Sequence, residues 1–191
     1  HRELRKRATL AGFFETVHFI FDDKKVVEKW GMSCVDEKKD LINPITSELD
    51  TLRVSLLPHL VASAQRNVNN SFKKIPLFEV GVIYNKDREE SRSMAFVWSG
   101  ATQDEHITNQ GKPPVITFET MAQKVSMIFG MVDFEPIEND VPLYLHPYRS
   151  AHIVLNGEII GVMGQLDSDF QEGYDLPVTF VCEVDLEKVT T

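Results

Sequence analysis

An Asn-Gly pair at residues 156–157 constrains the fold of this chain more than any other short segment. Residues 151–155 (AHIVL) and 158–163 (EIIGVM), on either side of the pair, are rich in apolar and β-branched residues. Asn and Gly both tolerate the positive φ angles of a type I′ turn, which joins two antiparallel strands. The sequence therefore predicts a β-hairpin here and an antiparallel sheet in the second half of the chain.

Further strands are expected where β-branched and aromatic residues cluster, at residues 13–21, 77–84, 94–98 and 178–184. Gly81 lies inside the second of these segments. A glycine within a strand indicates a bulge or a close backbone approach.

Helices are expected mainly before this region. Residues 2–11 are good helix formers and Gly12 follows them, while Asp22 and Asp23 can cap a helix that runs through Trp30. Leucines from Leu49 to Leu57 have near-helical spacing, Pro58 interrupts them, and a second apolar stripe continues to Val68. One more helix is expected at residues 117–130. This order is not an alternating βαβ series, so we expect an α+β fold with helices packed on one face of an antiparallel sheet.

Length and composition indicate one globular domain of 191 residues. The net charge of −9 disfavours stand-alone binding to a nucleic-acid backbone. The two cysteines, Cys34 and Cys182, form no CxxC motif, which excludes a disulfide scaffold and a Cys-rich zinc site and suits a cytoplasmic protein. No apolar run approaches the roughly 20 residues that span a bilayer, so no membrane association is expected. The chain begins at His1 inside a predicted helix, and we interpret it as a fragment of a longer protein.

Common catalytic motifs are absent: there is no P-loop, GxGxxG, GxSxG or HExxH. His146 and His152 lie six residues apart, but Pro147 lies between them and no third ligand is evident, so no metal site is expected.

Two charged residues lie in apolar surroundings, Arg53 between leucines and Glu79 within a strand segment. An unpaired buried charge costs several kcal/mol, so each belongs either to a structural ion pair or to a clamp that holds an anion or substrate.

Residues 43–60 carry a resemblance to a known family. Their pattern is an Asn-Pro turn, a spacer and then Leu-Arg-x-Ser-Leu-Leu-Pro. It resembles the core domain of the β subunit of bacterial-type phenylalanine–tRNA ligase. Further matches follow in order between about residues 8 and 184, and include Phe78-Glu79-Val80-Gly81, His146-Pro147 with Arg149, Ser150 and Ala151, and the glycines Gly161 and Gly164. Tyr148, where the family usually has Gly, and Asp167-Ser168, where a His-Pro pair often follows, depart from the pattern.

The resemblance implies a class II aminoacyl-tRNA synthetase-like fold, an antiparallel sheet flanked by helices, with residues 1–191 as one catalytic-like core domain of a longer β chain. Catalytic relatives place an Arg after the Tyr that corresponds to Tyr84, and a second Arg after a Gly-rich last strand. These cations stabilise the charge of the ATP phosphates. This chain has Asn85 at the first place and neither the glycines nor a terminal Arg in residues 181–188. The resemblance therefore implies a domain that is inactive alone and binds no cofactor, within a holoenzyme that uses ATP and magnesium.

The implied role is to support the α subunit, which attaches phenylalanine to its tRNA, within an (αβ)2 heterotetramer whose other parts make most contacts with tRNA. We expect the apolar faces of the early helices to contact α through a set of five residues: Leu4, Ala8, Leu60, Val61 and Ala64. On this hypothesis, Leu60→Asp abolishes binding to α and leaves the monomer folded.

Two other functions stay open. In the first, the chain is a ligand-binding or regulatory module that keeps a degenerate synthetase pocket. Four residues would form its clamp for an anion or substrate: Arg53, Glu79, His146 and Arg149. Alternatively it is a stand-alone ligase, which the two missing arginines disfavour.

Overall fold

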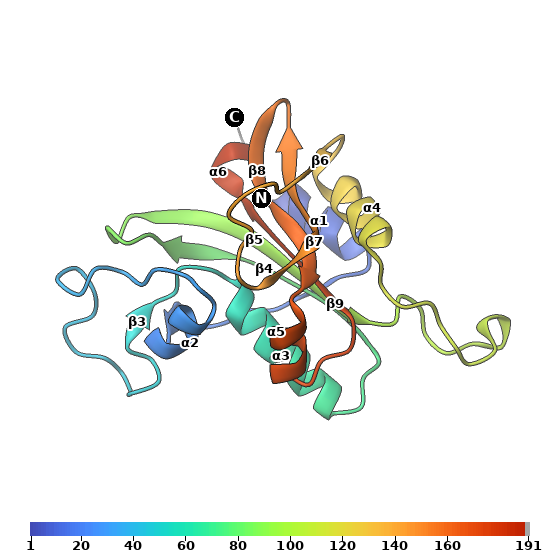
Figure 1. Cartoon of the computed structure of the whole chain (residues 1–191), viewed down its shortest axis with the longest axis horizontal. Coiled ribbons are helices and arrows are strands. Elements are labelled where there is room, and N and C mark those ends of the chain that lie inside the picture. The colour runs from blue at the N-terminus through green and yellow to red at the C-terminus, as the bar shows by residue number, and fades with distance from the viewer. Residues whose placement is uncertain (190–191) are drawn as a thin grey trace.

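The computed structural model describes residues 1–189, which form a seven-stranded sheet with helices on both sides (Figure 1). The strand order is β1-β4-β5-β9-β8-β7-β6, and every neighbouring pair is antiparallel except β1 and β4. The strands of this sheet are β1 (Phe14–Glu15), β4 (Lys74–Tyr84), β5 (Glu90–Gly100), β6 (Asp133–Pro136), β7 (Leu145–Leu155), β8 (Glu158–Leu166) and β9 (Thr179–Asp185). A second, two-stranded sheet pairs β2 (Phe21–Asp22) with β3 (Thr51–Leu52).

The predicted hairpin is confirmed. Asn156 and Gly157 have φ angles of 52° and 82°, and Leu155 of β7 pairs with Glu158 of β8. The antiparallel sheet that this turn predicted is also confirmed, apart from the short parallel pairing of β1 with β4.

Helices cover both faces of the sheet rather than one, which corrects the sequence expectation. The helices are α1 (Arg2–Leu10), α2 (Lys24–Lys29), α3 (Leu57–Asn69), α4 (Phe118–Phe129), α5 (Ser168–Gly173) and α6 (Leu186–Val189), and η1 (Ile107–Asn109) is a 3-10 turn. Figure 1 shows α1, α4 and α6 on one side of the sheet and α2, α3 and α5 on the other. The central strands are apolar at consecutive positions, as at Phe96 and Val97. Because successive strand side chains point to opposite faces, both faces need a cover.

Two segments differ from their predicted structure. Of residues 13–21, only Phe14 and Glu15 at one end and Phe21 at the other lie in strands. The near-helical leucines before Leu57 are not helical, because Thr51–Leu52 pairs with β2 and the backbone N–H of Arg53 donates to the carbonyl of Ile20. Helix α3 begins at Leu57 and holds Pro58 in its first turn, where proline is tolerated. Helix α1 ends before Gly12, as predicted, and Gly31 and Gly130 likewise follow the ends of α2 and α4. All three glycines have positive φ.

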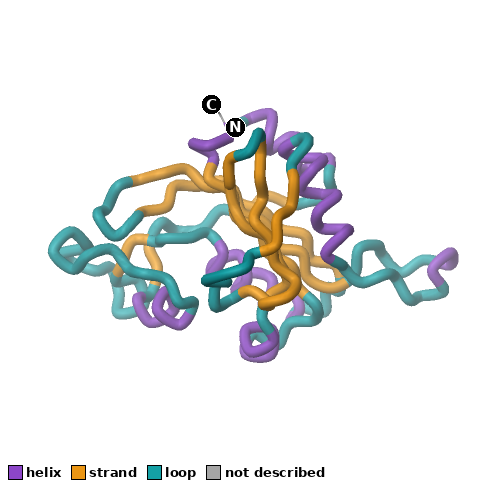
Figure 2. Tube along the Cα trace, turned by 45° about the horizontal axis from the view of Figure 1, so that its top comes forward, coloured by secondary structure: helices purple, strands orange, loops and turns teal. Residues whose placement is uncertain are grey.

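Figure 2 shows the strands as one twisted layer, with the loop that carries η1 extending away from it. None of the helices in residues 1–189 is both long and apolar enough to cross a membrane. Within the same residues, no group of three or more His, Cys, Asp or Glu side chains is placed to hold a metal ion.

Candidate functional site

A buried ion pair joins Arg53 to Glu79 on the sheet face that α3 covers. Their side chains are 3% and 2% exposed, and Arg53 Nη1 lies 2.8 Å from Glu79 Oε1. The guanidinium also donates to backbone, with Nε 2.8 Å from the carbonyl oxygen of Val82 and Nη1 3.3 Å from that of Phe19. Of the two alternatives that the sequence left open for Arg53 and Glu79, this geometry corresponds to the structural ion pair, and the two residues pair with each other.

His18 completes this network and was not identified from the sequence. Its Nδ1 lies 2.5 Å from Glu79 Oε2, and its Nε2 lies 2.6 Å from Ser63 Oγ on α3. Burial acts to raise the pKa of Glu79, but the hydrogen bond from His18 and the charge of Arg53 outweigh it and hold that pKa below its usual value. The available signal was a polar residue inside the apolar stretch 13–21, the same signal that singled out Glu79.

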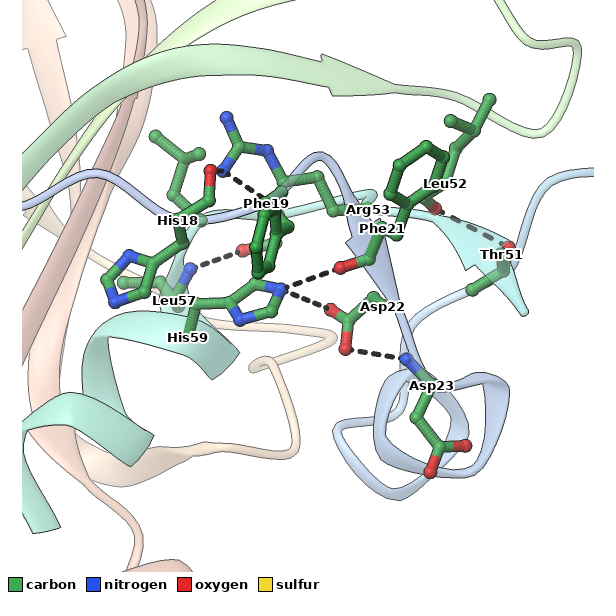
Figure 3. Close-up of polar contacts among 12 residues, drawn as sticks. His18, Phe19, Phe21, Asp22, Asp23, Thr51, Leu52, Arg53, Leu57 and His59 are labelled. Carbon is green, nitrogen blue, oxygen red and sulfur yellow. Dashed lines mark hydrogen bonds and ion pairs between the residues drawn. The ribbon is translucent and has the colours of Figure 1, made fainter. Parts of the chain in front are cut away.

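A second imidazole lies next to the first. The ring of His59 stacks on His18 with centroids 5.4 Å apart, its Nε2 donates to the carbonyl of Phe21 at 3.1 Å, and Asp22 Oδ2 lies 3.7 Å away (Figure 3). Burial lowers the pKa of His59 and raises the pKa of Asp22, because each loses hydration of its charged form. These contacts therefore hold β2 against α3.

Gly81 provides the space for Arg53. A Cβ atom on Gly81 would overlap Arg53 Nη2. The hydrogen bonds of Nε and Nη1 hold this guanidinium in place. The sequence predicted a bulge or a close backbone approach at this glycine, and the structure shows that the groups close to it are side chains.

Gly81→Ala is therefore expected to lower the free energy of unfolding by about 3 kcal/mol, because the guanidinium must leave its hydrogen bonds. Gly173→Ala in α5 is the matched control, since nothing lies within 4 Å of the added methyl group. Urea titration of both variants measures the difference. Equal stability of the two variants would show that Arg53 has room to move.

Glu183 on β9 is a second carboxylate on the same face of the sheet. It accepts hydrogen bonds from Ser55 Oγ at 2.5 Å, the backbone N–H of Leu56 at 3.0 Å and Ser93 Oγ at 2.9 Å. Burial raises the pKa of Glu183, although these three donors act in the opposite direction. Glu183 thus fixes the segment before α3 onto the centre of the sheet.

A cavity of about 580 Å³ lies beside Glu183. Ser55, Tyr84, Asn85 and Glu183 are among its lining residues, so the turn after β4 and the last strand both border it. The turn after β4 is where the resemblance implied the first phosphate-binding arginine of catalytic relatives, and β9 leads into the end of residues 181–188, where it implied the second. Among the described lining residues Lys86 is the one cation, so the cavity lacks both arginines.

The four-residue clamp proposed from the sequence does not form, which corrects that hypothesis. His146 and Arg149 belong to β7, which β5, β9 and β8 separate from Glu79 on β4. His146 Nδ1 accepts the backbone N–H of Tyr148 at 3.2 Å, and Arg149 Nη1 donates to Gln165 Oε1 at 2.8 Å. Arg53 and Glu79 are already neutralised by each other.

The prediction that five residues of the early helices form the interface with α is also wrong. Leu4 and Ala8 of α1 and Leu60, Val61 and Ala64 of α3 lie in the chain's own core, with at most 9% of each residue exposed. Each apolar helical stripe packs against the sheet, because the sheet is apolar on both faces. Their side chains are therefore not available to a partner subunit.

Exposed apolar side chains gather elsewhere, between the end of α1 and β2. Leu10, Phe14, Val17 and Phe19 are 74%, 65%, 87% and 73% exposed. Strand β1 within this segment is the edge strand of the sheet. We call residues 10–19 the edge segment. Clustered exposed apolar residues on a folded protein mark an interaction surface.

The fold defines this chain as a class II aminoacyl-tRNA synthetase-like protein. It superposes on two structures of pyrrolysyl-tRNA synthetase from Desulfitobacterium hafniense, with TM-scores of 0.68 and 0.67 and sequence identities of 18% and 17%. The superpositions cover 99% of this chain and 64% and 66% of those chains. The predicted fold class is confirmed.

The chain belongs to the family described as the phenylalanyl-tRNA synthetase beta chain CLM domain, whose model matches residues 1–186. It is 40% identical to the phenylalanine–tRNA ligase β subunit of Sulfurimonas denitrificans over 185 residues and 42% identical to that of Wolinella succinogenes over 187 residues. These matches cover 97% and 98% of this chain and 24% of each relative, so the chain spans about a quarter of their length. The family resemblance is confirmed.

Proposed function

We propose that this chain is the non-catalytic synthetase-like core of a phenylalanine–tRNA ligase β subunit and that it supports the α subunit that performs the reaction. The observation that carries this proposal is the cavity between the turn after β4 and β9, whose described lining residues include Asn85 and Glu183 but no arginine. An activation site for an amino acid needs fixed cations on the triphosphate, because charge develops at the α-phosphoryl group. The carboxylate of Glu183 at this cavity opposes that charge.

Arg53 does not substitute for the missing cations. Its guanidinium bonds Glu79 and two backbone carbonyls, so its charge is used within the fold. In this proposal the domain binds no cofactor, whereas the holoenzyme uses ATP and magnesium on the α subunit. The whole enzyme is a cytoplasmic heterotetramer of two α and two β subunits, and tRNA contacts it mainly through other parts.

The edge segment is the surface that this proposal assigns to α. Its four exposed apolar residues follow directly on α1, and the outer edge of β1 carries no strand among residues 1–189. An interface core of aromatic and aliphatic side chains supplies most of the binding energy in stable complexes. The family's designation as a β chain supports an α chain as the occupant.

The substitution Leu10→Asp is expected to weaken binding to α by about 2 kcal/mol or more, roughly thirtyfold, because it places a charge in an apolar interface. The natural polypeptide that contains these residues is mixed with α, and the dissociation constant is measured by analytical ultracentrifugation. Phenylalanine-dependent exchange of pyrophosphate into ATP is expected only when α is present.

Ile107→Asp is the matched control, since Ile107 is 87% exposed on a different loop. Equal binding by both variants would argue against the edge segment. Exchange activity by the β chain without α would contradict the non-catalytic role.

A further inference from the structure

A second cavity lies on the opposite face of the sheet, between α4, β6 and the first half of β7. Its volume is about 540 Å³, which is within the range of small-molecule sites. The lining residues Phe118, Phe134 and Phe180 belong to or pack against the core cluster of α1 and α4. Arg53, Glu79 and Glu183 lie on the opposite face, which α3 covers. It is therefore distinct from the cavity that corresponds to the synthetase active site.

The inner wall of this cavity is aromatic. Phe118 of α4 lies between Phe134 of β6 and Phe180 of β9, with ring centroids 6.2 and 6.4 Å away and steep interplanar angles of 78° and 72°. Edge-to-face rings of this kind offer both faces and edges to a further ring. Tyr148 also lines the cavity and is 92% exposed, so a fourth ring stands at its mouth.

Arg149 lines the same cavity and is held in position without an ion pair. Its Nη1 donates to Gln165 Oε1 at 2.8 Å, and Gln165 Nε2 donates to Gln171 Oε1 at 3.3 Å. Gln171 Oε1 in turn accepts the backbone N–H of Thr179 at 3.3 Å. In the part of the chain that the structure describes, no carboxylate lies within 4 Å of a nitrogen of Arg149. The remaining N–H donors of this guanidinium are therefore available to an anion at the cavity.

We propose that this cavity binds a small molecule that has an aromatic ring and a carboxylate. The ring packs on Phe118, Phe134 and Phe180, and the carboxylate accepts hydrogen bonds from Arg149. A guanidinium matches the geometry of a carboxylate, and one cation balances one negative charge. A doubly charged phosphate is disfavoured, because Glu119 also lines the cavity and the chain carries a net charge of −9.

The test uses the natural polypeptide that contains these residues, together with any subunit that co-purifies, and the probe 3-(4-fluorophenyl)propionate observed by fluorine NMR. The wild-type protein is expected to bind the probe saturably. Arg149→Gln is expected to weaken binding about tenfold or more, because it removes a charge-assisted hydrogen bond. Phe118→Ala is expected to weaken it as well. Arg92→Gln is the matched control, since Arg92 is exposed on β5 and does not line this cavity.

The melting temperature of each variant shows that the fold is kept, which is expected for Arg149 because its side chain is exposed. Unchanged affinity in Arg149→Gln overturns the proposal, as does the absence of binding at millimolar probe. Binding of the amine 2-(4-fluorophenyl)ethylamine is measured in the same way. If it binds in place of the carboxylate and Arg149→Gln has no effect, Glu119 provides the recognition and the proposal fails. Loss of binding in both Arg149→Gln and Phe118→Ala, with Arg92→Gln unchanged, supports the proposal.

Discussion

Leu60→Asp is expected to lower the free energy of unfolding by about 5 kcal/mol or more, which is much of the stability of a typical domain. Leu60 lies on α3 and is fully buried against the sheet. The substitution removes a packed side chain and places a carboxylate within an apolar cluster. Urea titration or limited proteolysis measures the loss. The result distinguishes a core residue from an interface residue, because an interface residue would leave the isolated domain as stable as before.

Leu10→Asp is the matched control for this experiment. The substitution is chemically identical and lies on a helix, but Leu10 is 74% exposed. Its effect on unfolding is expected to stay within about 0.5 kcal/mol. If Leu60→Asp left stability unchanged and abolished binding to α, the buried position of α3 described above would be contradicted.

Arg53→Met is expected to destabilise the chain by about 3–5 kcal/mol, because it leaves the Glu79 carboxylate buried without its cation. Arg53 also donates to the carbonyls of Val82 and Phe19, so the backbone of the edge segment loses a partner as well. Denaturant titration at neutral pH measures this loss. Adding Glu79→Gln to Arg53→Met is expected to recover part of the stability, since no charge then remains buried alone.

The pH dependence of stability provides an independent check on the same pair. The folded-state pKa of Glu79 lies below its ordinary value of 4.5, so the ionised carboxylate binds its partners more strongly than the protonated form. Its contribution to stability is therefore complete above that ordinary value and is lost as the pH falls through the lower, folded-state pKa. In Arg53→Met the pKa of Glu79 rises, and the loss begins at higher pH. An identical acid profile in wild type and variant would show that Arg53 does not act on Glu79.

The sequence predicted well the elements that local chemistry decides. The Asn156-Gly157 turn, the aspartate cap of α2, the glycine that follows α1 and the long strands are of this kind, because turn and cap preferences act within a few residues. Leucine spacing before Pro58 predicted a helix wrongly, since the pairing of β3 with β2 depends on a segment about 30 residues away. Secondary-structure propensity is a weak preference that such contacts override.

By itself the sequence determined the family, the antiparallel hairpins and the absence of arginine at the two phosphate-binding places. It also marked Arg53 and Glu79 as charges that need partners. Only the tertiary structure decided which partners they have, because Arg53, Glu79, His18 and Ser63 come from four separate segments of the chain. It likewise showed that α1 and α3 bury their apolar stripes within the chain, whereas the edge segment stays exposed. A helical stripe has the same pattern whether it packs on its own sheet or on a partner, and the distinction lies in what the fold places opposite it.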